Sequence, residues 1–221
     1  MKKVYILVSL ICCTISLAAQ ECTDLYFMQG PKTVTMTQYD TRGKKTGTLL
    51  YTVVEVNNRG DSIVSDMFIE SMNARGKTNG TLKGQFVCTG GVIKYDMKLG
   101  LPQFELTGKK SLQYTGDYLE YPLNMQVGSM LKNSSYTISG GRGLFKYIYY
   151  EITFRKVSGK ETITTPAGTW ECFRISYKGR YYFDEKKRNG MDASGMEFYA
   201  PDFGVVKTET PYYTLEVTDI K

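Results

Sequence analysis

The stretch that decides the fold reads TITTPAGTWECFRISY (162–177) and, after a charged gap, GMEFYAPDFGVVKTE (195–209). Each piece contains a turn, at 166–168 in the first and at 201–204 in the second, flanked by β-branched and aromatic residues. Proline and glycine form turns, whereas β-branched and aromatic residues favour strands. The stretch therefore predicts successive β-hairpins and identifies no catalytic chemistry.

A period of two residues dominates the rest of the chain. Residues 48–56 (TLLYTVVEV), 62–72 (SIVSDMFIESM) and 81–89 (TLKGQFVCT) are strand-like runs separated by short turns rich in glycine and asparagine. Such turns predict an antiparallel meander, and long antiparallel strands twist and coil. We predict an all-β protein, with a single curved antiparallel sheet of about ten strands that forms a half-barrel or an open barrel.

Two segments depart from simple alternation. Residues 99–131 alternate only weakly, which favours a short helix or a short capping segment over one mouth of the sheet. Residues 205–217 read as a strand interrupted by Pro211, which requires a sheet edge or a bulge.

The longest strand candidate is LFKYIYYEITFRKV, at 144–157. Its alternation places Ile152 on one face and Arg155 on the other. Ser158 and Gly159 are expected to end it in a turn.

The N-terminus is typical of an export signal. Lys2 and Lys3 precede an apolar stretch at 4–17, which is short for a membrane span, and Ala18 and Ala19 are small enough for a signal peptidase. We predict a signal peptide at 1–19, cleaved after Ala19, and a single β domain at 20–221.

A membrane anchor and a lipoprotein are the alternatives to a cleaved signal. The cysteines near the N-terminus follow Ile11, Cys12 and Glu21, whereas a lipidated cysteine normally follows a small residue. We therefore expect a soluble periplasmic or secreted protein with no stable transmembrane anchor.

Charge gives no sign of a nucleic-acid partner. The net charge of +6 becomes 6 − 2 = +4 when the two signal lysines are lost, and the charged residues are scattered except at 184–188. Without an extended basic stripe, the chain lacks the electrostatic signature of nucleic-acid binding.

Three cysteines remain after cleavage: Cys22, Cys88 and Cys172. One disulfide can form in an oxidising compartment and leaves one thiol over, but the sequence does not choose the pair. Cys88 and Cys172 lie in strand-like runs, where a buried free thiol is the simplest interpretation. No CxxC pair exists, so neither a redox site nor a zinc knuckle is predicted.

The chain contains no histidine, which excludes Ser-His-Asp and Cys-His nucleophilic sites and the common zinc sites. Asp66 and Glu70 share a strand face at about 13 Å, which is beyond the carboxylate separation of glycosidases. Glu151, Glu197 and Glu209 could pair across strands, although no pattern specifies such pairing. We predict no catalytic residue, cofactor or metal site, and we lean away from an enzyme.

Three motifs carry a family resemblance: TPAGTWEC at 165–172, FYAPDFGVVK at 198–207, and YPLNMQVGSML at 121–131. With these, the chain resembles the exported β-proteins of domain of unknown function 3108 and their Bacteroidetes relatives, including TapB-type proteins. The resemblance implies a curved antiparallel sheet, often described as a half-barrel, and an envelope location. It implies no catalytic residue.

Tyrosine is unusually frequent, with 18 copies against one tryptophan. A row of tyrosines on a sheet could bind a sugar or grip a partner protein, although tyrosine also favours strands for structural reasons. The candidate ligand or partner surface consists of Tyr147, Tyr149, Tyr177, Tyr181 and Tyr199.

The concave face of such a sheet is expected to be apolar, and methionine would make its lining adaptable. A filled core and an open cleft are both compatible with this pattern. The favoured function is a non-catalytic binding protein for a lipid or other apolar ligand, or for an envelope partner. The alternatives are an adhesion or surface-structure component, and a carbohydrate-binding or carbohydrate-active protein.

Overall fold

The computed structural model describes residues 22–100, 113–140, 146–188 and 190–221. The predicted signal peptide at 1–19 and its cleavage after Ala19 lie outside the described residues. So does part of the segment predicted to cap the sheet, at 101–112. Within the described residues, no helix is both long and apolar enough to cross a bilayer.

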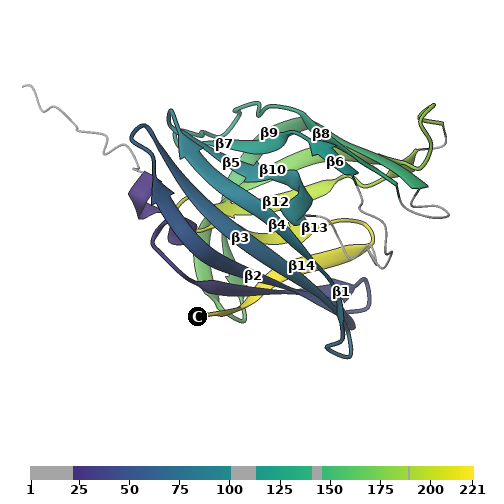
Figure 1. Ribbon diagram of the computed structural model, residues 1–221, viewed down its shortest axis with the longest axis horizontal. Coiled ribbons are helices and arrows are strands. Elements are labelled where there is room, and N and C mark those ends of the chain that lie inside the picture. The colour runs from purple at the N-terminus through teal and green to yellow at the C-terminus, as the bar shows by residue number, and fades with distance from the viewer. Residues whose placement is uncertain (1–21, 101–112, 141–145, 189) are drawn as a thin grey trace, which may run out of the picture.

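Fourteen strands of the described chain form one antiparallel sheet (Figure 1). They are β1 (Thr33–Asp40), β2 (Lys45–Asn58), β3 (Ser62–Asn73), β4 (Thr78–Thr89), β5 (Val92–Asp96), β6 (Gln113–Gly116), β7 (Tyr118–Pro122), β8 (Ser134–Ser139), β9 (Tyr147–Thr165), β10 (Gly168–Tyr182), β11 (Met191–Asp192), β12 (Gly195–Ala200), β13 (Gly204–Glu209) and β14 (Tyr213–Ile220). Three short 3-10 turns accompany them: η1 (Cys22–Asp24), η2 (Tyr26–Met28) and η3 (Met97–Gly100).

The strands are arranged in the order β6-β8-β9-β10-β12-β13-β14-β1-β2-β3-β4-β5-β7, with β11 paired to β10. The all-β antiparallel prediction is confirmed, but the count of about ten was too low. Strands β6, β7 and β11 have only four, five and two residues, too few to show a period of two in the sequence.

The sheet curls until its two ends meet, so it is a nearly closed barrel rather than a half-barrel (Figure 1). Beside β7, the Asp117 amide donates to the carbonyl of Ser135 on β8 at 2.9 Å, and Ser134 Oγ donates to the carbonyl of Tyr118 at 2.8 Å. The turn η3 contacts β4 and β5 on one side and β6 and β8 on the other, and it therefore bridges both ends.

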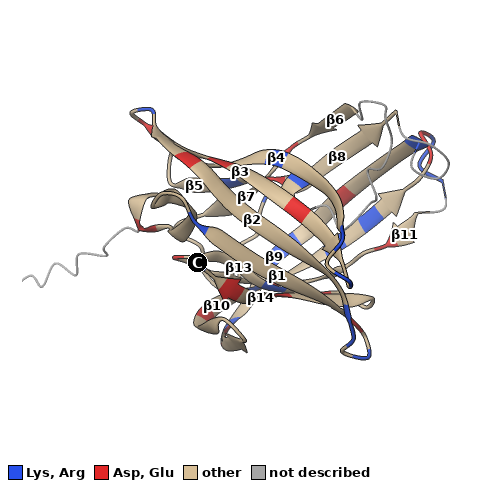
Figure 2. Cartoon of the chain, turned by 60° about the horizontal axis from the view of Figure 1, so that its bottom comes forward, with Lys and Arg blue, Asp and Glu red and all other residues tan. Residues whose placement is uncertain are grey.

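Charged residues of both signs are interspersed along the strands and the hairpin turns (Figure 2). The inner face is largely apolar, and its buried residues form one continuous core.

Strand β9 does not end at Ser158 and Gly159, so the turn predicted there was wrong. Pairing with β10 continues through this point, with Gly159 opposite Arg174, because a bulge beside Arg174 absorbs the irregularity. Pro211, by contrast, lies in the turn between β13 and β14 rather than within a strand.

A second irregularity in β9 reverses the predicted face of Arg155. Phe154 has a φ of 51° and is 64% exposed, at a point where the pairing with β10 shifts register. One extra residue inverts the alternation that follows it. Arg155 therefore points into the barrel, where its side chain is fully buried.

Arg155 closes the barrel from within. Its Nη1 donates to the carbonyl of Glu120 on β7 at 3.1 Å and to the carbonyl of Lys132, just before β8, at 3.3 Å. Its Nη2 lies 3.5 Å from Oε2 of Glu197 on β12, and its guanidinium carbon lies 4.7 Å from the ring centre of Tyr121. One side chain thus holds together three parts of the sheet.

The N-terminal turns η1 and η2 pack on the core (purple in Figure 1). Phe27 stacks on Phe86 of β4 at 4.9 Å and lies 5.5 Å from Phe203. Cys22 forms a disulfide with Cys88 of β4. The free-thiol interpretation of Cys88 was therefore wrong, because its position inside a strand does not reveal a partner 66 residues away. The interpretation of Cys172 as a buried free thiol is confirmed.

Removal of the disulfide is expected to lower the free energy of unfolding by about 2–4 kcal/mol, because the bridge closes a long loop in the unfolded chain. Denaturation of Cys22→Ala and of the wild type, each with and without reductant, measures this change. Reductant should destabilise only the wild type, and a wild type that ignores reductant contradicts the prediction.

Arg155→Met is expected to cost about 3–5 kcal/mol, because it leaves the buried Glu197 carboxylate without its cation. The double variant Arg155→Met/Glu197→Gln should recover much of this loss. Arg174→Met is the matched control, since its partly exposed ion pair with Glu161 should contribute less than about 1 kcal/mol. Urea denaturation measures all three variants, and equal losses for Arg155→Met and Arg174→Met would refute the closing role of Arg155.

Candidate functional site

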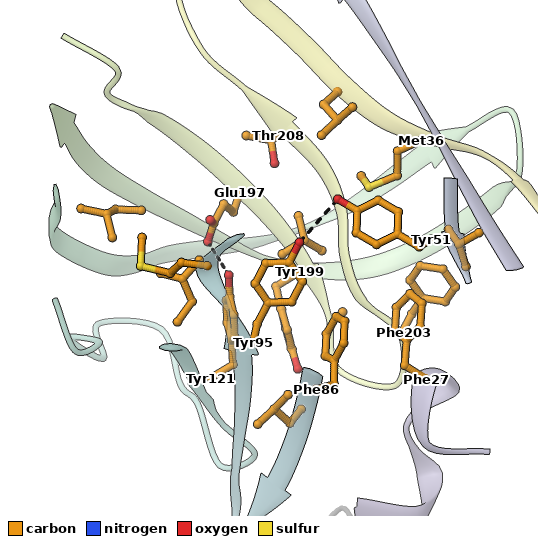
Figure 3. Close-up of a pocket in the computed structure, with 18 of the residues that line it drawn as sticks. Phe27, Met36, Tyr51, Phe86, Tyr95, Tyr121, Glu197, Tyr199, Phe203 and Thr208 are labelled. Atoms are coloured by element: carbon orange, nitrogen blue, oxygen red, sulfur yellow. Dashed lines mark hydrogen bonds between the residues drawn. The ribbon is translucent and has the colours of Figure 1, made fainter. Parts of the chain in front are cut away.

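The barrel contains a partly open cavity of about 140 Å³ (Figure 3). Side chains from the inner faces of most strands and from η2 and η3 line it. Its apolar wall includes Phe27, Phe86 and Phe203. Nine tyrosines also line it: Tyr51, Tyr95, Tyr121, Tyr136, Tyr150, Tyr177, Tyr181, Tyr199 and Tyr213. Among the lining residues of the described chain, Glu197 alone carries a formal charge at neutral pH.

The size of this cavity limits what it can hold. An engineered apolar cavity of about 150 Å³ accepts benzene or xenon, whereas sites for drug-sized ligands run from roughly 300 to 1,000 Å³. The cavity in this barrel can therefore take one ring-sized group or a short aliphatic segment. A whole lipid molecule is too large for it.

Glu197 lies at the centre of a buried polar cluster. Glu197 and Tyr199 are two residues apart on β12, which pairs with β13, and both face the cavity. Tyr121 donates its hydroxyl hydrogen to Glu197 Oε2 at 3.0 Å, and Arg155 approaches the same oxygen (Figure 3 shows the Tyr121 bond). The ring of Tyr121 in turn stacks on that of Tyr199 at 4.6 Å. A carboxylate that is only 7% exposed requires such partners.

The sequence analysis named Glu197 only as one of three carboxylates that could pair across strands. The structure does not pair it with Glu151 or Glu209: Glu151 accepts a hydrogen bond from Tyr182, and Glu209 is bound by Lys207. The ion-pair partner of Glu197 is Arg155, which the alternation of β9 had placed on the wrong face. The isolated carboxylate between the apolar residues Met196 and Phe198 was the one available signal.

The cavity tyrosines are neutral hydrogen-bonding groups. Burial raises the pKa of Tyr51 and of Tyr213 to about 12, and it raises the pKa of Tyr121 well above 10. Tyr51 donates to the carbonyl of Leu99 at 3.1 Å, and its hydroxyl lies 3.4 Å from that of Tyr95. Apart from Glu197, the wall is therefore mostly apolar, with uncharged phenol groups as its main polar points.

The five tyrosines of the predicted surface are divided between two faces of the sheet. Tyr177, Tyr181 and Tyr199 are buried and line the cavity. Tyr147 and Tyr149 are half-buried and do not line it. They alternate with the inward-facing Ile148 and Tyr150, so they belong to the outer face of β9. The five residues therefore do not form one surface.

Other candidate chemistry lies away from the cavity. Asp66 accepts a hydrogen bond from Gln85 at 2.8 Å, and Glu70 accepts one from Thr78; neither carboxylate lines the cavity. Burial raises the pKa of the Cys172 thiol to about 12, which makes it a poor nucleophile at neutral pH. The described residues contain no group of three or more Cys, Asp or Glu side chains able to hold a metal ion.

The raised pKa values predict a specific loss of stability in alkali. A neutral buried phenol contributes stability that is complete below its unfolded pKa of 10 and is lost as the pH rises through its folded value of about 12. The free energy of unfolding should therefore fall between pH 10 and pH 12. In the folded protein, the absorbance of the ionised buried tyrosines should appear at a higher pH than that of exposed tyrosines. Tyr51→Phe should make the fall smaller, and a constant stability across this window contradicts the assignment.

Two solved structures share the fold of this barrel. One is a Bacteroides fragilis protein provisionally described as exported and with a YmcC-like fold; it is 21% identical, with a TM-score of 0.74 over 86% of this chain and 95% of that chain. The other is a Parabacteroides distasonis protein provisionally described as a lipoprotein. It is 20% identical, with a TM-score of 0.76 over 91% of this chain and 100% of that one.

No functionally curated protein matches the sequence. The model of one family, described as DUF3108-like, matches residues 29–213, which is well over half of the chain. This span includes all three motifs that carried the resemblance and every residue of the Arg155, Glu197 and Tyr121 cluster. The chain therefore belongs to the DUF3108-like family.

Proposed function

We propose that the protein is an exported, non-catalytic binding protein that holds a small apolar group inside its barrel. The observation that carries this proposal is the partly open cavity of about 140 Å³, walled by apolar and tyrosine side chains. Concave and mostly apolar sites with a few fixed polar groups are the usual form of a small-molecule site. The absence of histidine from the chain and the high pKa of the Cys172 thiol favour binding over catalysis.

An envelope location fits the proposal. The predicted signal at 1–19 directs export, and the two similar structures are described as an exported protein and a lipoprotein. The disulfide of Cys22 with Cys88 suits an oxidising compartment. It also occupies the sulfur of Cys22, so this cysteine is not a lipid attachment point. We infer a soluble periplasmic or secreted protein.

The placement of the tyrosines favours an interior ligand over a sugar or an adhesion partner. A stacking platform for sugars needs several aromatic faces exposed on one side of the sheet. Three of the five candidate tyrosines point into the barrel instead. The outer Tyr149 ring is covered by Lys187, whose ammonium lies 3.4 Å from the ring centre.

Methionine methyl groups report directly on the cavity. Met28, Met36 and Met97 line it, whereas Met130 and Met191 are exposed on the outside. Benzene, which matches the cavity in size, should shift the methyl NMR signals of the first three and leave the other two unchanged. Equal shifts for Met130, or none for the cavity methionines, would contradict the proposal.

A pair of variants tests whether occupancy depends on the cavity volume. Leu215 lines the cavity from β14. Leu215→Phe is expected to fill part of the space and to weaken benzene binding at least about tenfold, whereas Leu215→Met conserves volume and should bind nearly as the wild type does. Titration of the Met36 methyl signal measures both affinities.

A further inference from the structure

We propose that the bound group is a neutral hydrogen-bond donor on a ring-sized apolar body, such as a phenol or an indole, and that Glu197 receives the donated hydrogen. This inference rests on the proposed binding function and specifies the chemistry of its ligand.

The first support is the unused acceptor capacity of Glu197. Both of its protein donors, the Tyr121 hydroxyl and Arg155 Nη2, approach the same oxygen, Oε2. In the part of the chain that the structure describes, the other oxygen, Oε1, accepts no hydrogen bond from a side chain. A carboxylate can accept several hydrogen bonds through both oxygens. The side chain lines the cavity, so a ligand can supply the missing donor.

The second support is the charge balance of the wall. Arg155 compensates the charge of Glu197 but does not line the cavity, and its Nη1 is already occupied by the carbonyls of Glu120 and Lys132. A ligand carboxylate would therefore meet Glu197 without an available cation. A ligand ammonium would lose its hydration and find a carboxylate already paired. A neutral donor avoids both costs and gains a hydrogen bond to a charged acceptor.

The third support is the shape of the wall beside Glu197. Tyr121 and Tyr199 are stacked with an interplanar angle of 12°, and Tyr150 stacks on Tyr181 at 4.4 Å. All four rings line the cavity, and Tyr121 contacts the acceptor Glu197 directly. A flat ligand can pack against them and still direct a hydroxyl or ring N–H at Oε1.

Three fluorinated rings of nearly equal size test the inference: 4-fluorophenol, fluorobenzene and 4-fluorobenzoate. Fluorine NMR titration of the wild-type protein at neutral pH gives the three dissociation constants. We expect 4-fluorophenol to bind about tenfold or more tightly than fluorobenzene, because a hydrogen bond to a charged group is worth roughly 1.5–3 kcal/mol. The benzoate should bind more weakly than fluorobenzene.

Glu197→Gln separates charge from shape. The amide keeps an acceptor oxygen but loses the charge, so the advantage of the phenol should shrink to about threefold or less and the penalty of the benzoate should largely disappear. If this variant does not fold, Tyr121→Phe replaces it. That variant frees Oε2 as well, and the preference for the phenol over fluorobenzene should persist or grow.

The outcomes distinguish the inference from the function on which it rests. Equal binding of phenol and fluorobenzene, or tightest binding of the benzoate, overturns the donor inference while the binding function stands. If none of the three rings binds and benzene does not shift the cavity methionines, the proposed function itself fails.

Discussion

The buried guanidinium of Arg155 is the interaction on which the rest of the structure depends. A cation removed from water needs partners, and those of Arg155 come from β7, from the segment before β8, and from β12. They bind Nη1 and Nη2, whereas Nε has no hydrogen-bond partner among the described residues. Strand β7 is at one end of the strand order and β8 is next to the other end. The hydrogen bonds of Arg155 to both regions therefore hold the two ends of the sheet together. The same cation allows a carboxylate, Glu197, to face an otherwise apolar interior.

The cavity persists because the groups around it cannot easily move into it. The ring of Tyr121 is stacked on that of Tyr199, and its hydroxyl is held by Glu197. On another side, Phe27 packs against Phe86 and is held there by the disulfide of the nearby Cys22. Because these side chains cannot move into the cavity, it stays open. A ligand that fills it gains van der Waals contacts with the wall.

Much of the fold followed from local pattern. Along β9 the alternation correctly places Ile148 and Ile152 inside and Tyr149 outside. It fails at Phe154, because the register with β10 decides whether an extra residue is accommodated there, and no local preference predicts an exposed phenylalanine with positive φ. That single residue hid the direction of Arg155, and with it the candidate site.

The sequence by itself determined the class of fold, the antiparallel hairpins and the family motifs, because period-two alternation and turn residues act over a few neighbouring positions. It also determined that histidine chemistry is absent. Only the tertiary structure decided that Cys22 bonds Cys88, that Arg155 meets Glu197, and that tyrosines from distant strands surround one cavity. The first two contacts join residues 66 and 42 positions apart, and the formation of all three depends on how the whole sheet closes.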